Sequence, residues 1–332
     1  MTETFELNSS YSTTRQVLNA DPKYMVEVIE YSNKPEDKFE TVLFLPANQD
    51  RKGVGGLRSQ GYFKISENIF QSRRYDKRSE QSKPEKPLIT IITVVFNGEL
   101  FLEETIQSVL NQTYENVEYI IIDGGSTDGT LDIIRKYEHA IDYWVSESDK
   151  GMYDALNKGL ALAQGDILNF INSDDYFYDC EVLASMSEYF LKNGAQCAYG
   201  KSEYVNLHGG KIFEKKPLSY KKRYLKTLGL FFSQPTFFWT KKLMKRNGLI
   251  DLKYQVSADY DFIANMMVDS NKVIRSRRII SCFRVFGESF GDKNSKLAAK
   301  EFSLINKKYE FPFSKLISLY DRLVQKVYQY FG

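Results

Sequence analysis

The chain has 332 residues, of which 42% are hydrophobic and 27% charged, and this ordinary composition excludes disorder throughout. Its 45 Lys and Arg residues against 43 Asp and Glu residues leave a formal net charge of +2, which excludes a global nucleic-acid-binding surface. Three cysteines without paired spacing and two histidines exclude a zinc site of a usual kind and indicate a reducing compartment. No secretory leader or membrane-spanning stretch is evident, so we expect a cytoplasmic protein.

The first part of the chain predicts an accessory region. Residues 1–70 are polar at first, then contain a strand-like stretch at 41–46 and a glycine-rich run at 52–58. That run lacks the preceding strand and following helix of a phosphate-binding loop, which favours turns over ligand binding. Residues 71–86 are almost wholly charged or polar and are typical of a linker.

A strongly periodic pattern starts at residue 88. Apolar, β-rich runs at 89–96, 117–122, 143–145 and 167–171 predict strands, and apolar residues at helical spacing predict helices near 102–110, 131–137 and 155–160. Strands and helices that alternate at this interval form right-handed βαβ units around a parallel sheet. The carboxyl ends of those strands therefore meet at one edge.

The pattern is looser after residue 175. It predicts a helix, a strand, a basic loop at 211–223, an aromatic strand-like run at 228–239 and a helix after 259–261. An apolar stripe at 314–331, with basic residues opposite, predicts a terminal amphipathic helix. Such a helix either docks on its own core or lies in a membrane interface.

Carboxylates follow two of the predicted strands directly. Asp123 ends the second strand before Gly124 and Gly125, and Asp174 and Asp175 follow the fourth. Ligands of open α/β sheets bind outside the carboxyl ends of the strands, and the glycines let a flat ring approach the backbone. These acids therefore favour a nucleotide site, although a turn is the alternative for 172–175 and helix capping is the alternative for residues 126–128.

The acidic pair also suits a divalent cation. Mg²⁺ or Mn²⁺ is commonly held by one or two carboxylates together with substrate phosphates, so one acid of the pair can hold the metal while the other takes a ribose hydroxyl. Lys150, in a loop at the same edge, can face phosphates, and Asp154 near the next helix start can equally be plain dipole pairing.

Four segments together resemble the family-two glycosyltransferases of the GT-A fold, and within them the bacterial polysaccharide-assembly enzymes of the colanic-acid type. They are the end of the first strand at 94–97, the run Asp-Gly-Gly-Ser-Thr-Asp-Gly-Thr at 123–130, the run at 146–159 and Asn-Ser-Asp-Asp at 172–175. The resemblance covers about residues 87–289. It implies a Rossmann-like, mostly parallel central sheet with helices on both faces, an N-terminal extension and a C-terminal helical tail.

The resemblance also implies the organisation of the chain. It places a glycosyltransferase domain at 87–290, with a nucleotide-binding half at 87–175 and an acceptor half at 176–290, before a helical tail at 291–332. The implied donor is a nucleotide-diphosphate sugar, a UDP-sugar first, and the implied cofactor is Mn²⁺ or Mg²⁺. The donor-binding residues would be Val95, Asn97, Asp123, Gly125, Asp128, Lys150, Gly151 and Asp174.

Specific roles follow from the same resemblance. Asp123 would contact the base, Asp174 the ribose and Asp175 the metal, while Gln234 matches an acceptor-side motif. The family's general base follows in a Glu-Asp pair, but this chain has Ser-Ala-Asp-Tyr-Asp at 257–261. The base is carried onto Asp259, with Asp261 as its competitor.

The expected activity is a hexosyltransferase of class EC 2.4. It would invert the anomeric carbon and serve surface polysaccharide biosynthesis, with a glycan or lipid-linked acceptor at the inner face of the cytoplasmic membrane. Direct displacement at a sugar carbon needs a base for the acceptor hydroxyl and a cation for the leaving diphosphate. One alternative is a nucleotidyltransferase, but such an enzyme typically has a basic glycine-rich loop, which is absent at residues 96–99. The other alternative is a catalytically silent nucleotide-sugar-binding protein.

Overall fold

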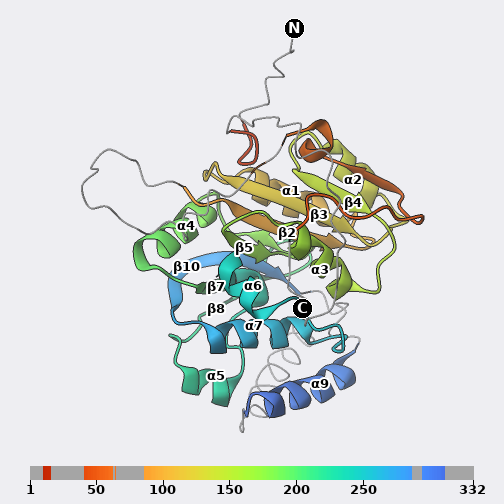
Figure 1. Ribbon diagram of the computed structural model, residues 1–332. Coiled ribbons are helices and arrows are strands. Elements are labelled where there is room, and N and C mark those ends of the chain that lie inside the picture. The colour runs from red at the N-terminus through yellow and green to blue at the C-terminus, as the bar shows by residue number, and fades with distance from the viewer. Residues whose placement is uncertain (1–9, 16–40, 63, 65–85, 286–293, 311–332) are drawn as a thin grey trace.

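A ten-stranded sheet forms the centre of the molecule (Figure 1). The computed structural model describes residues 10–15, 41–62, 64, 86–285 and 294–310. The strand order is β1-β4-β3-β2-β5-β9-β7-β10-β6, and β8 pairs with β7. The strands are β1 (Gly53–Gly55), β2 (Ile89–Val95), β3 (Val117–Asp123), β4 (Tyr143–Ser146), β5 (Ile167–Phe170), β6 (Tyr176–Phe177), β7 (Cys197–Val205), β8 (Lys211–Lys215), β9 (Phe238–Thr240) and β10 (Val273–Arg284).

The four strands β4, β3, β2 and β5 run parallel to one another. β7 and β10 form a second parallel pair, and β9 joins the two groups by antiparallel pairing with β5 and β7. The fold is therefore the mostly parallel α/β class that the alternating pattern predicts.

Helices cover both faces of this sheet (Figure 1). The branched apolar side chains of β2 alternate between two cores: Ile92 and Val94 lie in one, Ile91 and Val95 in the other. Strands that are buried on both faces are expected to be continuously apolar. The helices are α1 (Leu102–Leu110), α2 (Thr130–Lys136), α3 (Met152–Leu162), α4 (Val182–Asn193), α5 (Lys222–Leu228), α6 (Lys241–Asn247), α7 (Ala258–Asp269) and α9 (Ser295–Lys308), with short 3-10 turns at Leu57–Gln60 and Gln234–Thr236.

Three predictions from local pattern are wrong. Residues 41–46 form no strand, although Val42 and Leu45 are buried in the core. The basic segment at 211–223 begins with strand β8 rather than a loop, and the aromatic run at 228–239 is mostly irregular, with only β9 at its end. Residue 42 and strand β9 pair with segments far away in sequence, which local composition does not reveal. β8 instead forms a hairpin with the preceding strand β7, and its basic composition hid this pairing.

The glycine-rich run forms the edge of the sheet instead of a separate unit. β1 pairs antiparallel with β4, and Gly56 and Gly61 adopt positive φ around the 3-10 turn. This is turn and edge chemistry, the alternative that the sequence favours. The predicted amphipathic helix at 314–331 lies outside the described residues.

Candidate active site

The acidic segments predicted from sequence lie on one edge of the sheet. β2 lies between β3 and β5, with Val95 opposite Asp123 and Ile92 opposite Phe170. Neighbouring strands are spaced about 4.8 Å apart, so the ends of β3 and β5 are separated by the width of one strand. We call this edge, formed by residues 95–101, 123–130, 147–151 and 172–175, the rim.

The loop after β2 links the two acidic segments. Toward β3, the amide of Asn97 donates to Ser126 Oγ at 2.7 Å, and the amide of Thr127 donates to Asn97 Oδ1 at 2.9 Å. Toward β5, a Cβ placed on Gly98 would lie 3.3 Å from Ser173 Oγ. The rim is therefore a continuous surface from the Asp123 loop to the Asp174 loop.

The Asp123 side chain faces into the protein. It is fully buried, and its carboxylate accepts hydrogen bonds from the Ser126 amide, from Ser126 Oγ and from Ser146 Oγ at 2.6 Å. These bonds close the turn that follows β3. The role predicted for Asp123 as a contact of the base stays a prediction, but its oxygens are already used by the protein.

Other predicted donor residues shape the same loop. The Asp128 carboxylate accepts the amides of Glu99 and Thr130 at 3.1 Å each, and the bond to Thr130 forms an Asx turn before α2. The N-cap of α2 is Gly129, so Asp128 is not the helix cap that the capping alternative predicts. Val95 is buried and its carbonyl accepts the Gly124 amide, while Gly125 has φ 83° and its carbonyl accepts Lys52 Nζ at 2.7 Å. Lys52 comes from the segment before β1, so sequence analysis did not connect it with the site.

The loop after β4 completes the rim. Lys150 is exposed, and its amide donates to Asp154 Oδ2 at 3.1 Å. Gly151 is exposed and has φ 112° at the start of α3, a conformation that strongly favours glycine. The lysine side chain is thus accessible at the same edge as Asp123 and Asp174.

Asp175 carries an unpaired oxygen. The residue is buried, and its Oδ1 accepts the Arg284 amide at 3.0 Å, whereas Oδ2 has no hydrogen-bond partner among the described residues. The Asn172 side chain, whose Oδ1 is also unpartnered, lies beside it. Burial and the charge of Asp174 raise the pKa of Asp175, and burial raises the pKa of the partly exposed Asp174.

The described residues hold no cluster of three or more His, Cys, Asp or Glu side chains that could bind a metal ion alone. A divalent cation whose coordination shell is completed by substrate phosphates and water needs only one or two protein carboxylates. The unpartnered Asp175 Oδ2 beside Asp174 is such a donor set. The residues present therefore fit a substrate-completed divalent cation and do not fit an independent structural metal.

Arg284 is a functional candidate that sequence analysis missed. Its side chain is buried at the end of β10, donates through Nε to the Asp174 carbonyl at 3.1 Å and pairs with Glu104 of α1. The guanidinium also lies over the rings of Phe101 and Tyr176, 4.5 and 5.5 Å from their centroids. An arginine directly after the mostly apolar run at 279–283 was the available signal, but the partners named here lie 108 to 183 positions earlier.

Gln234 lies beside the end of β5. Its Nε2 donates to the Phe170 carbonyl at 2.7 Å, and the side chain is partly exposed. The Asn169 side chain donates to the carbonyls of Pro235 and Phe237, which fixes the same 3-10 turn. The predicted acceptor motif is thus held next to the acidic segment at 172–175.

The two candidate bases face different partners. Asp259 and Asp261 both lie in the first turn of α7. Asp259 is partly exposed and accepts a hydrogen bond from the Tyr153 hydroxyl at 2.9 Å. Asp261 is buried, and Lys308 Nζ donates to both of its oxygens at 2.8 and 2.9 Å. The structure thus bonds Asp259 to Tyr153 of α3 and pairs Asp261 with α9.

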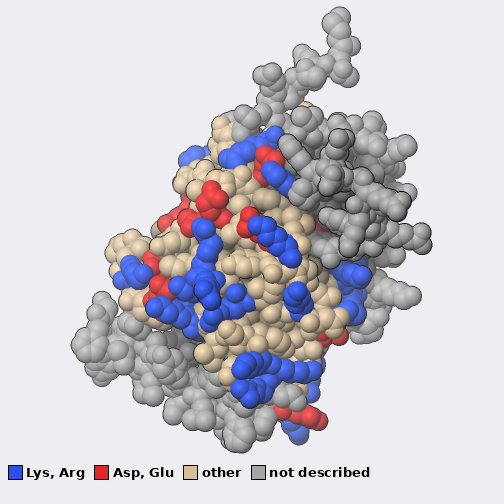
Figure 2. All heavy atoms as spheres, turned by 90° about the vertical axis from the view of Figure 1, so that its left-hand side faces the viewer, with Lys and Arg blue, Asp and Glu red and all other residues tan. Residues whose placement is uncertain are grey.

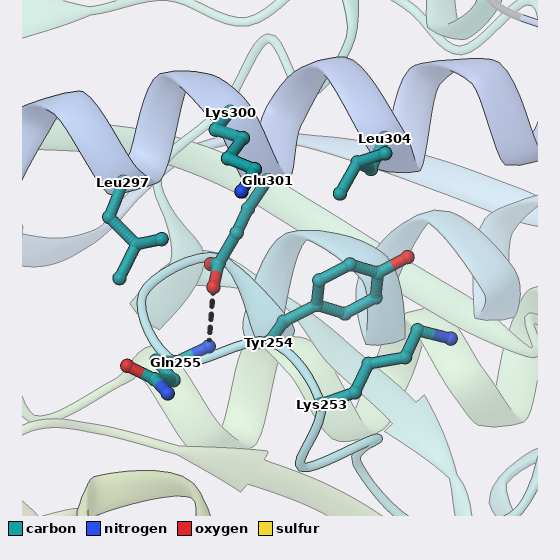
Figure 3. A pocket seen from close by; sticks show the side chains of 7 residues that line it. All are labelled: Lys253, Tyr254, Gln255, Leu297, Lys300, Glu301 and Leu304. Carbon is teal, nitrogen blue, oxygen red and sulfur yellow. Dashed lines mark hydrogen bonds between the residues drawn. The ribbon is translucent and has the colours of Figure 1, made fainter.

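The segment that leads into α7 is held from α9. The Glu301 carboxylate accepts the amides of Gln255, Val256 and Ser257 at 2.7 to 2.9 Å. Figure 3 shows the bond to Gln255 beside a pocket of about 410 Å³, between α9 and this segment, that Lys253, Tyr254 and Leu304 help to line. Burial raises the pKa of Asp259, and the hydrogen bond from Tyr153 opposes this rise.

Comparison with known proteins identifies the family. The family model described as Glycosyl transferase family 2 matches residues 90–252. An uncharacterised glycosyltransferase of Mycobacterium tuberculosis (strain CDC 1551 / Oshkosh) is 34% identical over 181 residues, which span 53% of this chain and 68% of the relative. A PGL/p-HBAD biosynthesis glycosyltransferase of Mycobacterium bovis (strain BCG / Pasteur 1173P2) is 29% identical over 224 residues, which span 65% of this chain and 82% of the relative.

Solved structures agree on the fold. The crystal structure of Staphylococcus aureus TarS 1–349 in complex with UDP has a TM-score of 0.50 and 20% sequence identity, and the match covers 64% of each chain. The match thus spans slightly under two-thirds of that chain, and at this identity it bears on the fold alone. Together with the family match and the 34% identical relative, the fold shows that the chain belongs to glycosyltransferase family 2 and is a glycosyltransferase with a GT-A architecture.

Proposed function

We propose that the chain is an inverting, metal-dependent glycosyltransferase that moves a sugar from a nucleotide-diphosphate sugar to a hydroxyl of a glycan or lipid-linked acceptor. The observation that carries this proposal is the rim, where the loops after β2, β3, β4 and β5 meet. We assign the donor to the half at 87–175 and the acceptor to the half at 176–290.

Asp175 would hold the cation, and Asp174 beside it would contact the ribose of the donor. The unpartnered buried Asp175 Oδ2 supports this assignment, because a buried carboxylate oxygen without a donor is costly unless something else satisfies it. The cation, when bound with the diphosphate, supplies charge stabilisation for the leaving group. Arg284 fixes the Asp174 carbonyl and the Asp175 carboxylate, and so orients both acids.

Asp259 is the proposed general base. It is accessible and unpaired with any cation among the described residues, whereas Lys308 occupies both oxygens of Asp261. A base accepts the proton of the acceptor hydroxyl as the hydroxyl attacks the anomeric carbon. The Tyr153 hydroxyl, which also lies 2.6 Å from the Val256 carbonyl, can donate to Asp259 while the acid is ionised and to the carbonyl after proton uptake.

The donor class is proposed from chemistry and likeness together. The TarS fragment has been solved in complex with UDP and with UDP-GlcNAc. We place the nucleotide of this chain along the rim, with the exposed Lys150 and Gly151 near the phosphates. A UDP-sugar is the first donor to test.

The proposed setting is surface polysaccharide assembly at the inner face of the cytoplasmic membrane. Within the described parts of the chain, no helix is long and apolar enough to span a bilayer. Figure 2 shows more Lys and Arg than Asp and Glu side chains on the face that carries α4, β10 and α5. Lys221, Lys222 and Arg223 at the start of α5 are exposed and suit contact with an anionic surface.

The test is donor turnover by the full chain. With Mn²⁺ and UDP-GlcNAc, UDP-glucose or GDP-mannose, we expect release of the nucleotide diphosphate from at least one donor. Asp259→Asn should lower kcat by about 10²- to 10⁴-fold, the range typical of a lost general base, and keep the affinity for the nucleotide diphosphate. Asp261→Asn is the matched control.

Two results would overturn this assignment. Absence of turnover with every donor, despite nucleotide binding, would favour a silent binding protein. Turnover that survives Asp259→Asn and is lost in Asp261→Asn would move the base to Asp261.

A further inference from the structure

Two side chains lie close to the Gly124 backbone on the rim. A Cβ placed on this glycine would lie 2.6 Å from Asp149 Oδ2 and 3.5 Å from Phe96 Cδ2. The Gly124 amide donates to the Val95 carbonyl at 2.9 Å, so the backbone beneath this position is fixed. An acid and an aromatic ring therefore flank one patch of bare backbone.

Asp149 has one oxygen to spare. Its Oδ1 accepts the Gly151 amide at 2.8 Å, and no described residue donates to Oδ2, the oxygen next to Gly124. Burial raises the pKa of Asp149, while the bond from the Gly151 amide and the charge of Lys158 oppose this rise. A ligand that donates an N–H to Oδ2 would offset this unfavourable environment.

Phe96 provides an apolar face beside this acid. It follows β2 directly and is 65% exposed, which is unusual for a phenylalanine. Nucleobases stack on exposed aromatic side chains, and this contact tolerates different bases because each base has an aromatic face. The ring thus offers the stacking contact and Asp149 the polar contact of a base site.

Asp123 does not compete for this role. It is fully buried, and Ser126 and Ser146 already donate to its two oxygens. Among the acids at 123–130 and 147–149, Asp149 is the one that has an oxygen without a hydrogen-bond partner within the described residues.

We propose that Asp149 reads the nucleobase of the donor by accepting its imino N–H while the base lies against Phe96 over Gly124. This inference rests on the proposed function and goes further by naming the residue that selects the base. A carboxylate only accepts hydrogen bonds. Uracil and guanine present a ring N–H on the pairing edge, whereas cytosine and adenine present a ring acceptor there, so UDP or GDP should bind more tightly than CDP or ADP.

Calorimetric titration of the full chain in the presence of Mn²⁺ tests this reading. The ligands are UDP, GDP, CDP, ADP and inorganic pyrophosphate. We expect the wild type to bind UDP or GDP about 10-fold or more tighter than CDP. In Asp149→Asn, affinity for the preferred nucleotide should fall about 10- to 100-fold, the scale of a lost hydrogen bond to a charged group, and pyrophosphate binding should not change.

Two further variants separate base reading from a general loss of charge or of folding. Asp132→Asn removes an exposed acid of α2, outside the rim, and should leave the base preference intact. Gly124→Ala keeps an accessible backbone conformation, since this glycine lies outside the positive-φ region, but its methyl group meets Asp149 Oδ2. It should therefore lose affinity much as Asp149→Asn does, with an unchanged unfolding midpoint.

The outcomes distinguish the inference from the proposed function. If the wild type binds none of the four nucleotides with Mn²⁺, the nucleotide site itself is wrong, and with it the inference. If the wild type binds UDP or GDP and Asp149→Asn keeps that affinity within about twofold with the same order of preference, the proposed function stands and the role of Asp149 is overturned.

Discussion

The buried carboxylates at the two ends of the central sheet differ in how completely they are hydrogen-bonded. At the amino end of β3, Glu118 is fully buried and receives Arg58 at 2.6 Å, Thr90 Oγ1 at 2.5 Å and the Gln164 amide at 2.8 Å. Asp142, before β4, is paired with Lys64 at 2.8 Å in the same manner. Each buried carboxylate there has its oxygens satisfied by the protein.

The carboxyl end combines satisfied acids, such as Asp123, with acids that have an oxygen without a partner among the described residues. Asp175 Oδ2 has no donor, and Asp149 Oδ2 faces the bare backbone of Gly124. A buried charge that is paired and hydrogen-bonded holds a fold together, whereas one without partners lowers stability and persists where a ligand supplies what is missing. The difference between the ends therefore separates structural acids from acids that act on a ligand.

The largest effect is expected from breaking the paired end. Arg58→Ala leaves the Glu118 charge buried without its cation and should lower the free energy of unfolding by about 3–5 kcal/mol. Chemical denaturation measures this. Arg278→Ala is the matched control, because its ion pair with Asp179 has the same kind of geometry at 2.7 Å but is exposed, and it should cost under about 1 kcal/mol. Equal losses in the two variants would contradict the comparison.

The unpaired end should respond in the reverse direction. Asp175→Asn removes a buried carboxylate whose pKa is raised. Near neutral pH this carboxylate destabilises the folded state relative to the unfolded chain, so its removal should stabilise the protein. We expect the free energy of unfolding to rise by about 0.5–1 kcal/mol while kcat falls by about 100-fold or more. A variant that is both less stable and fully active would refute the division between the two ends.

A smaller effect concerns the proposed base. The hydrogen bond from Tyr153 favours ionised Asp259, which burial and the charge of Glu301 disfavour. Tyr153→Phe should therefore raise the pKa of Asp259, and the acid limb of the kcat/KM profile should move up by about one pH unit. Tyr199→Phe is the matched control, since its buried hydroxyl donates only to the Leu218 carbonyl. A Tyr153→Phe profile that overlays the wild type would contradict a link to the base.

The smallest effect is expected at Lys241, a partly buried lysine near the amino end of the sheet. Burial lowers the pKa of Lys241 to about 8, so the charged form of this lysine lowers the free energy of unfolding near pH 7. Lys241→Met should raise the free energy of unfolding at pH 7 by about 1 kcal/mol, less than full conversion of the shift because the side chain keeps some contact with water. Because the unfolded chain binds more protons between about pH 8 and 10.4, the gain should shrink as the pH rises through this window. A gain that grows with pH would contradict the assignment.

The parallel part of the fold could be predicted from the sequence because its signals are local. β2 to β5 and their helices have continuous apolar runs or helical spacing, and their bounds agree with the pattern to within a few residues. β1 and β9 could not be found, since three-residue strands are defined by pairing with distant partners and not by periodicity.

The sequence predicted which segments form the candidate site, but not which side-chain atoms face a ligand. The side chain of an acid at a strand end can be partly exposed, like that of Asp174, or buried, like that of Asp123, which accepts hydrogen bonds from Ser126 and Ser146. The sequence does not distinguish the two cases. Arg284 and Glu301 act on residues 109 and 44 to 46 positions away, respectively, and no local pattern records such contacts. The spare oxygen of Asp149 likewise became visible only from its position over Gly124.

The central claim is that the rim binds a nucleoside diphosphate together with a divalent cation held by Asp175. Calorimetric titration of UDP and GDP into the full chain, with and without Mn²⁺, tests it most directly. The account predicts that Mn²⁺ tightens binding of one of them by about 10-fold or more in the wild type and leaves it unchanged in Asp175→Asn. Equal affinity with and without Mn²⁺ in the wild type, or the same enhancement in Asp175→Asn, would contradict it.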